Sequence, residues 1–240
     1  MRLVLLRVGL DTGCRPSGLG PIFRDSSFEL VWIPDTLDED EHCYGNTTGR
    51  HGRPFVAYLS PSQRAAAAAR SMHVDPEFET CTYGDPTTQK SGLKRLETGD
   101  VLAFYAGLRP YDFEAEDALY LIGYFVVIEV TMSHDIDDVH RKQFFQGNAH
   151  VRNPKRCARD QDHLLLIRGG SDSRLFERAV RISRRGQDRS GKPLHIQSDE
   201  MVRIFGDFGG QRSIQRSPPR WVAPEHTEMA WQFLHRAGFK

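Results

Sequence analysis

Histidine and aspartate side chains that could transfer protons occur in two loop segments far apart in the chain. His73 and Asp75 lie two residues apart in a segment that Pro76 ends, so in an extended chain their side chains point the same way. Asp11 is the one carboxylate in a glycine-rich loop, residues 9–20, whose backbone can approach a ligand closely. Histidine titrates near neutral pH, and a carboxylate can orient it. We therefore predict that Asp11, His73 and Asp75 are catalytic acid–base residues, and that they converge with Tyr105 on one concave pocket.

The same residues allow two other interpretations. In a non-catalytic binding module they would be hydrogen-bonding specificity groups, or they would be structural, with Asp75 capping a turn and His73 packing on Phe78. A metal-assisted hydrolase would use His73, Asp75 and His150, whose side chains suit a divalent metal ion. No close spacing such as His-x-x-x-His supports a metal centre, so the sequence predicts no metal ligands and leaves the cofactor unassigned.

An apolar, aromatic and β-branched stretch over residues 96–130 predicts the strands that must position these groups. A Gly-Asp turn signal precedes the first strand, which begins at Val101 and ends at Tyr105. An acidic loop separates it from the second strand, residues 119–130, in which Gly123 indicates a bulge or a close backbone approach. We expect the two strands to be antiparallel neighbours at the centre of the sheet.

Hydrophobic periodicity and turn signals predict further elements along the chain. The expected strands are residues 2–8, 28–33, 163–170 and 178–183. The expected helices are residues 60–70, where five consecutive alanines favour a helix, and residues 89–96, 134–146, 199–205 and 225–237. Residues 184–193 read as a basic turn and residues 148–151 as a polar loop. The pattern indicates an α+β fold with a single domain over residues 1–240.

The amino-acid composition limits the classes of protein to which the chain can belong. The chain has 240 residues and 39% hydrophobic residues, enough for a core without disulfides or metal. No apolar run approaches the ~20 residues that a membrane helix needs, and residues 1–10 are too short and too soon interrupted for a signal peptide. We therefore expect a cytoplasmic protein with no membrane partner. The four cysteines are widely spaced, which argues against a disulfide framework and against a zinc ribbon.

Charge is unevenly distributed although the net charge is zero. Residues 25–135 hold 8 lysines and arginines against 19 aspartates and glutamates, whereas residues 151–222 hold 16 against 8. The basic part, residues 152–220, could bind a polyanion through arginines such as Arg168, with an affinity that falls as salt rises. Alternatively, the acidic and basic parts neutralise each other across the fold.

Taken in order, these motifs resemble known families. The Gly-Asp turn, the strand ending in Phe-Tyr and the strand containing Ile-Gly are similar to the central hairpin of PUA-like barrels of the ASCH and EVE type. An ordinary core hairpin explains the same residues. Motifs along nearly the whole chain resemble the nucleotide-modification-associated domain family, third type. They are Arg7-Val8-Gly9-Leu10-Asp11, residues 17–22, His73-Val74-Asp75-Pro76, the hairpin from Gly99 to Tyr105, and Asn148-Ala149-His150-Val151.

The resemblance implies both a fold and a function. The fold would be a PUA-like curved, mostly antiparallel β-barrel around residues 96–130 with flanking helices. The protein would recognise or alter a base of a nucleotide or nucleic acid, alone or with partner modification enzymes, and Phe104 or Tyr105 at the barrel rim would stack on that base, worth roughly 1–3 kcal/mol. The expected nucleotide-binding residues are Arg7, Tyr83, Asp85, Phe104, Tyr105, Asn148, His150 and Arg168.

Overall fold

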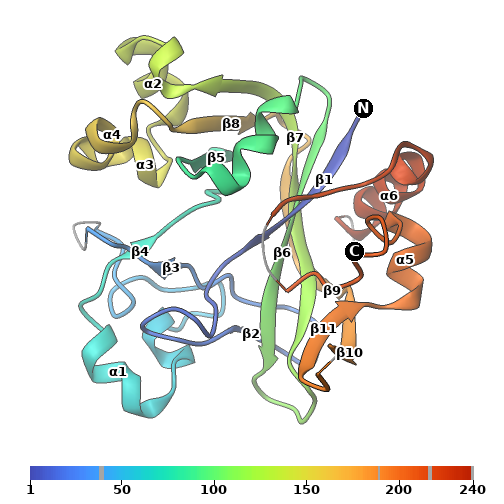
Figure 1. Ribbon diagram of the computed structural model, residues 1–240. Helices are drawn as coiled ribbons and strands as arrows, with labels where there is room; N and C mark the ends of the chain where they lie inside the picture. Colours follow the sequence, from blue (N-terminus) through green and yellow to red (C-terminus); the bar gives the residue numbers. More distant parts are fainter. Residues whose placement is uncertain (38–40, 189, 216–217, 239–240) are drawn as a thin grey trace.

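A large mixed sheet forms the frame of the protein. The computed structural model describes residues 1–37, 41–188, 190–215 and 218–238. Its strands follow the order β12-β1-β6-β7-β8-β5, with β2 beside β6 and β9 beside β7. The strands are β1 Leu3–Val8, β2 Gly20–Ile22, β5 Thr82–Asp85, β6 Val101–Pro110, β7 Ala118–Met132, β8 Leu165–Gly169, β9 Arg174–Arg181 and β12 Arg220–Trp221. The long strands β6 and β7 run through the centre of the molecule (Figure 1).

The central hairpin is present as predicted. Strands β6 and β7 pair antiparallel, from Val101 opposite Val126 to Leu108 opposite Ala118. The register shifts beside Gly123, so that Ile122 is the extra residue of a bulge at the predicted position. The first eight residues of β6 are all buried, which explains why this stretch is continuously apolar instead of alternating.

Gly123 is required by a close backbone approach. A Cβ atom there would lie 2.5 Å from the carbonyl oxygen of Arg174 and 2.9 Å from the ring of Phe78. The carbonyl belongs to β9, the strand paired with β7, so it cannot move without disturbing the sheet.

We expect Gly123→Ala to lower the free energy of unfolding by about 1–3 kcal/mol through overpacking. Gly13→Ala is the matched control, because a Cβ atom at Gly13 meets no atom within 4 Å. Urea denaturation measures both variants. A Gly123→Ala protein as stable as the Gly13→Ala protein would contradict this account of the bulge.

The sheet does not close into a barrel over the residues that the structure describes. Strands β12 and β5 stand at opposite ends of the strand order. Both β1 and β2 pair parallel to β6, whereas the other strand pairs are antiparallel. Beyond the central hairpin, β7 pairs with β9 along one part of its length and with β8 along another. The α+β class is confirmed, and the strand pairing shows an open mixed sheet where a PUA-like barrel was expected.

Helices and two small sheets surround this frame. The small sheets pair β3 Ile33–Pro34 with β4 Met72–His73, and β10 Ser183–Gln187 with β11 Pro193–Gln197. The α-helices are α1 Pro61–Ala67, α2 Asp138–Phe145, α3 Ala149–Arg152, α4 Pro154–Asp160, α5 Asp199–Phe205 and α6 Pro224–Ala237. Short 3-10 helices are η1 Phe55–Tyr58, η2 Thr88–Arg95 and η3 Ser133–Asp135. In Figure 1, α5 and α6 lie on one side of the central hairpin, and α1, β3 and β4 lie on the other.

Several local predictions differ from the structure. The first hairpin strand runs on to Pro110 instead of ending at Tyr105, and His73 lies in β4 instead of a loop. Residues 28–33 were expected to form a strand, but Phe28 makes only an isolated bridge and is buried by packing, so only Ile33 at the end of the segment enters a strand. Residues 184–193 form most of the β10–β11 hairpin instead of a turn alone. Residues 148–151 contain the start of α3, because the Asn148 side chain accepts a hydrogen bond from the backbone N–H of His150 and so caps a helix.

Two predicted absences concern membranes and disulfides. No helix in the described ranges is long and apolar enough to cross a membrane. No disulfide joins the four cysteines, all of which lie in the described part of the chain.

Candidate functional site

A cavity of about 510 Å³ lies between the segment of β3 and β4 and the segment of α3 and α4. Its polar lining residues are Arg7, Asp11, Thr36, His73, Asp75, Asp85, Thr87, Lys90, His150, Arg156 and Gln215. They come from segments far apart in the sequence. A larger cavity, about 690 Å³, lies between residues 12–17 and α1, but its described lining contains no histidine and no carboxylate. A third cavity, about 630 Å³, contains His42 and several glutamates. Among the described residues, only the 510 Å³ cavity brings two histidines and a carboxylate within 4.8 Å of one another, so it is the better candidate for chemistry.

The three predicted catalytic residues, Asp11, His73 and Asp75, all line this cavity. Several predicted nucleotide-binding residues line it too: Arg7, Tyr83, Asp85 and His150. Their catalytic and binding roles remain predictions, since proximity alone assigns no role. The structure does bring together groups that the sequence only suggested were related.

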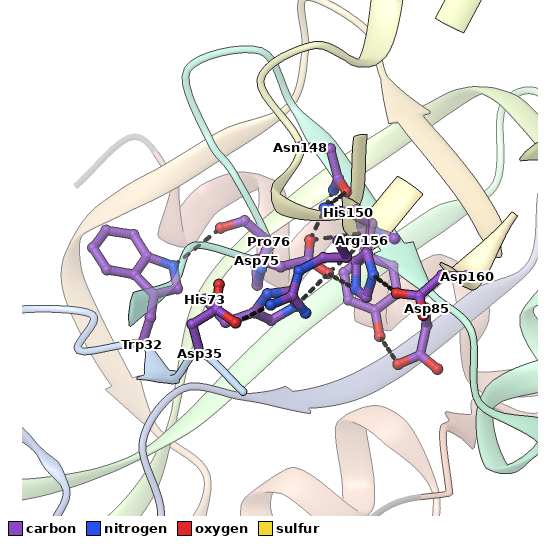
Figure 2. A network of polar contacts seen from close by, with 12 residues as sticks. Trp32, Asp35, His73, Asp75, Pro76, Asp85, Asn148, His150, Arg156 and Asp160 are labelled. Atoms are coloured by element: carbon purple, nitrogen blue, oxygen red, sulfur yellow. Dashed lines mark hydrogen bonds and ion pairs between the residues drawn. The ribbon is translucent and has the colours of Figure 1, made fainter. Parts of the chain in front are cut away.

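At the centre of the site, Asp75 faces two imidazole rings (Figure 2). The Nε2 atoms of His73 and His150 each lie 3.9 Å from Asp75 Oδ2. The two rings meet edge to face, with centroids 4.6 Å apart. All three side chains are almost entirely buried. A separation of 3.9 Å is too long for a hydrogen bond but within reach of an ion pair if the histidine is protonated, so the acid–base pairing of His73 with Asp75 stays a prediction.

Asp75 is oriented from behind by two neighbouring segments. The backbone N–H of Gly84 lies 3.2 Å from each carboxylate oxygen, and Asn148 Nδ2 donates to Oδ1 at 3.1 Å. Burial raises the pKa of Asp75 well above its usual value, although these donors and the Lys90 charge oppose the shift. A Cβ atom at Gly84 would lie 2.8 Å from Asn148 Oδ1, so only glycine allows this approach. The predicted residue Asn148 thus acts through Asp75 and does not line the cavity.

His150 is held by a carboxylate that the sequence did not single out. Its Nδ1 lies 2.9 Å from Asp160 Oδ2, and Arg159 Nε donates to the other oxygen at 2.7 Å. Burial alone would raise the pKa of Asp160, but the His150 and Arg159 donors outweigh it and hold that pKa well below its usual range. An ionised carboxylate only accepts hydrogen bonds, so Nδ1 of His150 carries a proton. The other ring nitrogen, Nε2, lies 3.9 Å from Asp75 Oδ2.

A second polar network joins Tyr83, Asp85 and Lys90 in the cavity wall. The Tyr83 hydroxyl donates to Asp85 Oδ2 at 3.0 Å, and Lys90 Nζ lies 2.7 Å from the same oxygen. Burial alone would raise the pKa of Asp85, but the Lys90 ammonium and the Thr87 donors lower it overall. Burial and the nearby Asp85 charge raise the pKa of Tyr83 well above its usual value, so the phenol stays a neutral donor. Lys90, a cation in the cavity wall, was not among the predicted residues.

Arg156 crosses the cavity wall to Asp35 (Figure 2). Its Nη2 donates to Asp35 Oδ1, and the two side chains are 4% and 1% exposed. The pair ties α4 to the chain that follows β3. Charges separated by 121 positions in sequence give no local signal of such a contact.

Arg7 and Asp11 connect the cavity to a neighbouring one. Arg7 Nη2 lies 3.1 Å from Asp11 Oδ2, and Asp11 Oδ1 also accepts from the backbone N–H of Thr12. Both residues line an adjoining cavity of about 250 Å³ that also contains Arg185 and His195. A ligand longer than a single ring system could span the two cavities.

The predicted positions of Phe104 and Tyr105 at a barrel rim are wrong. Phe104 is fully buried and packs edge to face on Phe125, with ring centroids 4.7 Å apart. Tyr105 is 1% exposed, and its hydroxyl donates to the backbone oxygen of Ile214. Because both faces of β6 are covered, consecutive side chains of this strand enter the core on opposite sides. Neither ring is available to stack on a base, and Tyr105 does not line the cavity on which it was predicted to converge with Asp11, His73 and Asp75.

Several arginines of the basic part pair with the acidic part. Arg168, also outside the cavity, lies 2.8 Å from Glu129 and places its guanidinium over the ring of Phe144. Arg156 bonds to Asp35 and Arg185 to Asp117. For these three arginines the structure supports mutual neutralisation across the fold.

Comparison with known proteins adds one result. No curated protein and no solved structure matches the chain. A family described as nucleotide modification associated domain 3 matches residues 2–236, a range that includes every residue of the cavity wall. The chain therefore belongs to the nucleotide modification associated domain 3 family.

Proposed function

We propose that the protein binds a nucleotide, free or within a nucleic acid, in the 510 Å³ cavity and acts on its base there. The observation that carries this proposal is the convergence of His73, Asp75 and His150 with the cations Arg7 and Lys90 on one cavity. Titratable groups with shifted pKa values that converge on a cavity are typical of functional sites, so a ligand best explains a gathering of this kind. Membership of the family supports a nucleotide-modification-associated role.

The size and charge of the cavity suit a nucleotide. Its volume lies within the roughly 300–1,000 Å³ typical of small-molecule sites. We place the base beside His73 and Asp75, and the phosphate toward Arg7 and the adjoining cavity. There, burial and the Arg185 charge lower the pKa of His195, which keeps its ring neutral near pH 7 and therefore able both to donate and to accept.

Catalysis and binding without catalysis are the two forms of this proposal. Burial makes Asp75 a weak acid that can hold a proton, and Asp11 is the more exposed carboxylate of the wall. These properties favour an enzyme, in which Asp11 remains an acid–base candidate. Relationship to PUA-like modules rests on the β6–β7 hairpin alone. Mass spectrometry of nucleotides incubated with the protein distinguishes an enzyme, which changes their mass, from a binding module.

Nucleotide binding should depend on Arg7. We expect 5′-mononucleotides or short single-stranded oligonucleotides to bind at low salt in calorimetric titrations, and Arg7→Ala to weaken binding by about tenfold or more, because a charged hydrogen bond is lost. Higher salt should weaken binding further.

Arg203→Ala is the matched control for Arg7→Ala. Arg203 is exposed on α5, away from the cavity lining, so its replacement should leave the affinity unchanged. Equal affinities of the two variants would place the ligand elsewhere. Failure of wild-type protein to bind any of these ligands would refute the proposal.

A further inference from the structure

We infer that His73, Asp75 and His150 bind a divalent transition-metal ion. Among the residues that the structure describes, these three bring one ligand atom each to within 4.8 Å of one another. The inference goes beyond nucleotide binding, because it assigns an ion site that can be tested without any nucleotide.

The spacing of the donors is close to that of a metal centre. Two ligands bound at about 2.1 Å in a tetrahedral arrangement lie roughly 3.4 Å apart. Each imidazole Nε2 lies 3.9 Å from Asp75 Oδ2, so these two gaps would need to close by about half an ångström on metal binding. The separation between the two histidine donors is within 4.8 Å and would need to close by up to about 1.4 Å. Small rotations of side chains that already face one another can supply this movement (Figure 2).

The hydrogen bond between Nδ1 of His150 and Asp160 leaves the other ring nitrogen, Nε2, to face Asp75. Asp160 accepts from Nδ1 of His150, so in the neutral ring the Nε2 lone pair points toward the Asp75 carboxylate. A metal ion between these two atoms would bind both of them. A carboxylate behind a metal-binding histidine is also the usual means of orienting the ring and fixing its tautomer.

The carboxylate ligand is positioned in the same way. Asp75 Oδ1 accepts from the Asn148 amide and from the N–H of Gly84, while Oδ2 is directed at the two histidines. Both potential ligand types are therefore supported by hydrogen bonds from a second layer of residues. Asp160 and Asn148 are positioning residues in this arrangement.

The donor set indicates the class of metal and the character of the site. Two imidazoles and one carboxylate suit zinc, iron(II) or manganese, whereas magnesium and calcium prefer sites made only of oxygen ligands. Three protein ligands leave further coordination positions open, and these would face the cavity. That is the pattern of catalytic sites, in which the metal lowers the pKa of a bound water or polarises a substrate oxygen.

The test is a titration of chelator-treated, full-length protein with Co²⁺, followed by its visible absorption, and displacement by Zn²⁺. We expect one equivalent to bind, and Mg²⁺ not to displace it. His73→Ala, Asp75→Asn and His150→Ala should each lower the affinity by more than about 100-fold, since loss of an outer partner alone costs about 10–100-fold. Asp75→Asn preserves the shape of the site if an alanine variant fails to fold.

Two comparisons separate metal binding from a structural role. Asp160→Ala should weaken binding more than Asp160→Asn, because an amide oxygen can still accept from Nδ1 of His150. His140→Ala is the control, since His140 pairs with Glu129 at 2.5 Å but belongs to no group of three donors in the described chain. Its affinity for Co²⁺ should match wild type.

Absence of stoichiometric Co²⁺ and Zn²⁺ binding by folded wild-type protein would overturn the inference, as would unchanged affinity in Asp75→Asn. Circular dichroism establishes that each variant is folded. Because no nucleotide is present, a failed metal titration leaves the nucleotide-binding proposal intact. Failure of nucleotide binding likewise leaves the metal titration interpretable.

Discussion

Replacing Arg156 by alanine is expected to lower the free energy of unfolding by about 3–5 kcal/mol, the largest stability effect that we foresee for a single side chain. Arg156 and Asp35 are both buried, and the guanidinium bonds directly to the carboxylate. Removal of the arginine leaves the Asp35 charge in a site with little access to water. The backbone N–H of Leu37 still donates to Asp35, but a neutral donor does not replace the lost charge.

Urea denaturation of Arg156→Ala, Asp35→Leu and the Arg156→Met/Asp35→Leu double variant tests this expectation. The double variant should recover part of the lost stability, because an apolar pair leaves no buried charge behind. Arg184→Ala is the control: Arg184 and Asp199 form an exposed pair, worth at most about 1 kcal/mol. An Arg156→Ala protein within 1 kcal/mol of wild type would show that Asp35 is solvated or neutral.

Asp75→Asn is expected to abolish the proposed activity on a base while increasing the stability of the metal-free protein at neutral pH. Asparagine keeps the shape of the side chain and an oxygen that can accept from Gly84 and Asn148. It cannot hold a negative charge between His73 and His150, so metal binding and chemistry at this point should be lost. Stability should rise because the variant no longer buries an ionisable carboxyl group.

The pH dependence of this gain has a definite sign. Burial raises the pKa of Asp75 in the folded protein above its unfolded value. The protonated group contributes its full stability below the unfolded pKa, and this contribution is lost as pH rises toward and through the folded pKa. Asparagine does not titrate, so the difference in Tm between variant and wild type should grow from pH 4 upward. A difference that stays constant with pH, measured with chelator present, would contradict this view of Asp75.

His73→Ala provides the complementary comparison. It removes a second donor from the cluster without removing a buried carboxyl group, so we expect loss of ligand binding with a Tm close to wild type. If His73→Ala and Asp75→Asn both retained full activity on a nucleotide, the reacting end of the cavity would have to lie elsewhere. Asp11, 37% exposed beside Arg7, would then be the first residue to replace.

Local sequence patterns determined the central hairpin, the helices and the family. The run from Val101 onward is apolar on both faces because both faces are covered, so the pattern alone identifies a buried strand. Gly123 signals its bulge, since no other residue tolerates the backbone of β9 so close to the chain. The helices near residues 61–67, 199–205 and 224–237 also follow from composition and periodicity within a few positions. All of these signals act between near neighbours in sequence.

The direction of strand pairing was decided by the tertiary structure. Nothing in residues 2–8 shows that β1 pairs parallel to β6, nor that the sheet stays open instead of closing into a barrel. The apolar pattern that identified β6 as a strand reflects burial on both faces. For the same reason, the side chains of Phe104 and Tyr105 lie in the core and not at an exposed edge.

For the candidate site too, the sequence determined some features and the tertiary structure decided the others. Residue types were enough to select Asp11, His73 and Asp75, although His73 lies in β4 where a loop was predicted, and order along the chain was enough to include His150. The hydrogen-bond and ion-pair partners of the site could not be predicted from the sequence. Asp160 contacts His150 because the chain turns between α3 and α4, and Arg156 contacts Asp35, which is 121 positions away. Hydrogen bonds and ion pairs depend on distances of a few ångströms, and only the folded chain sets those distances.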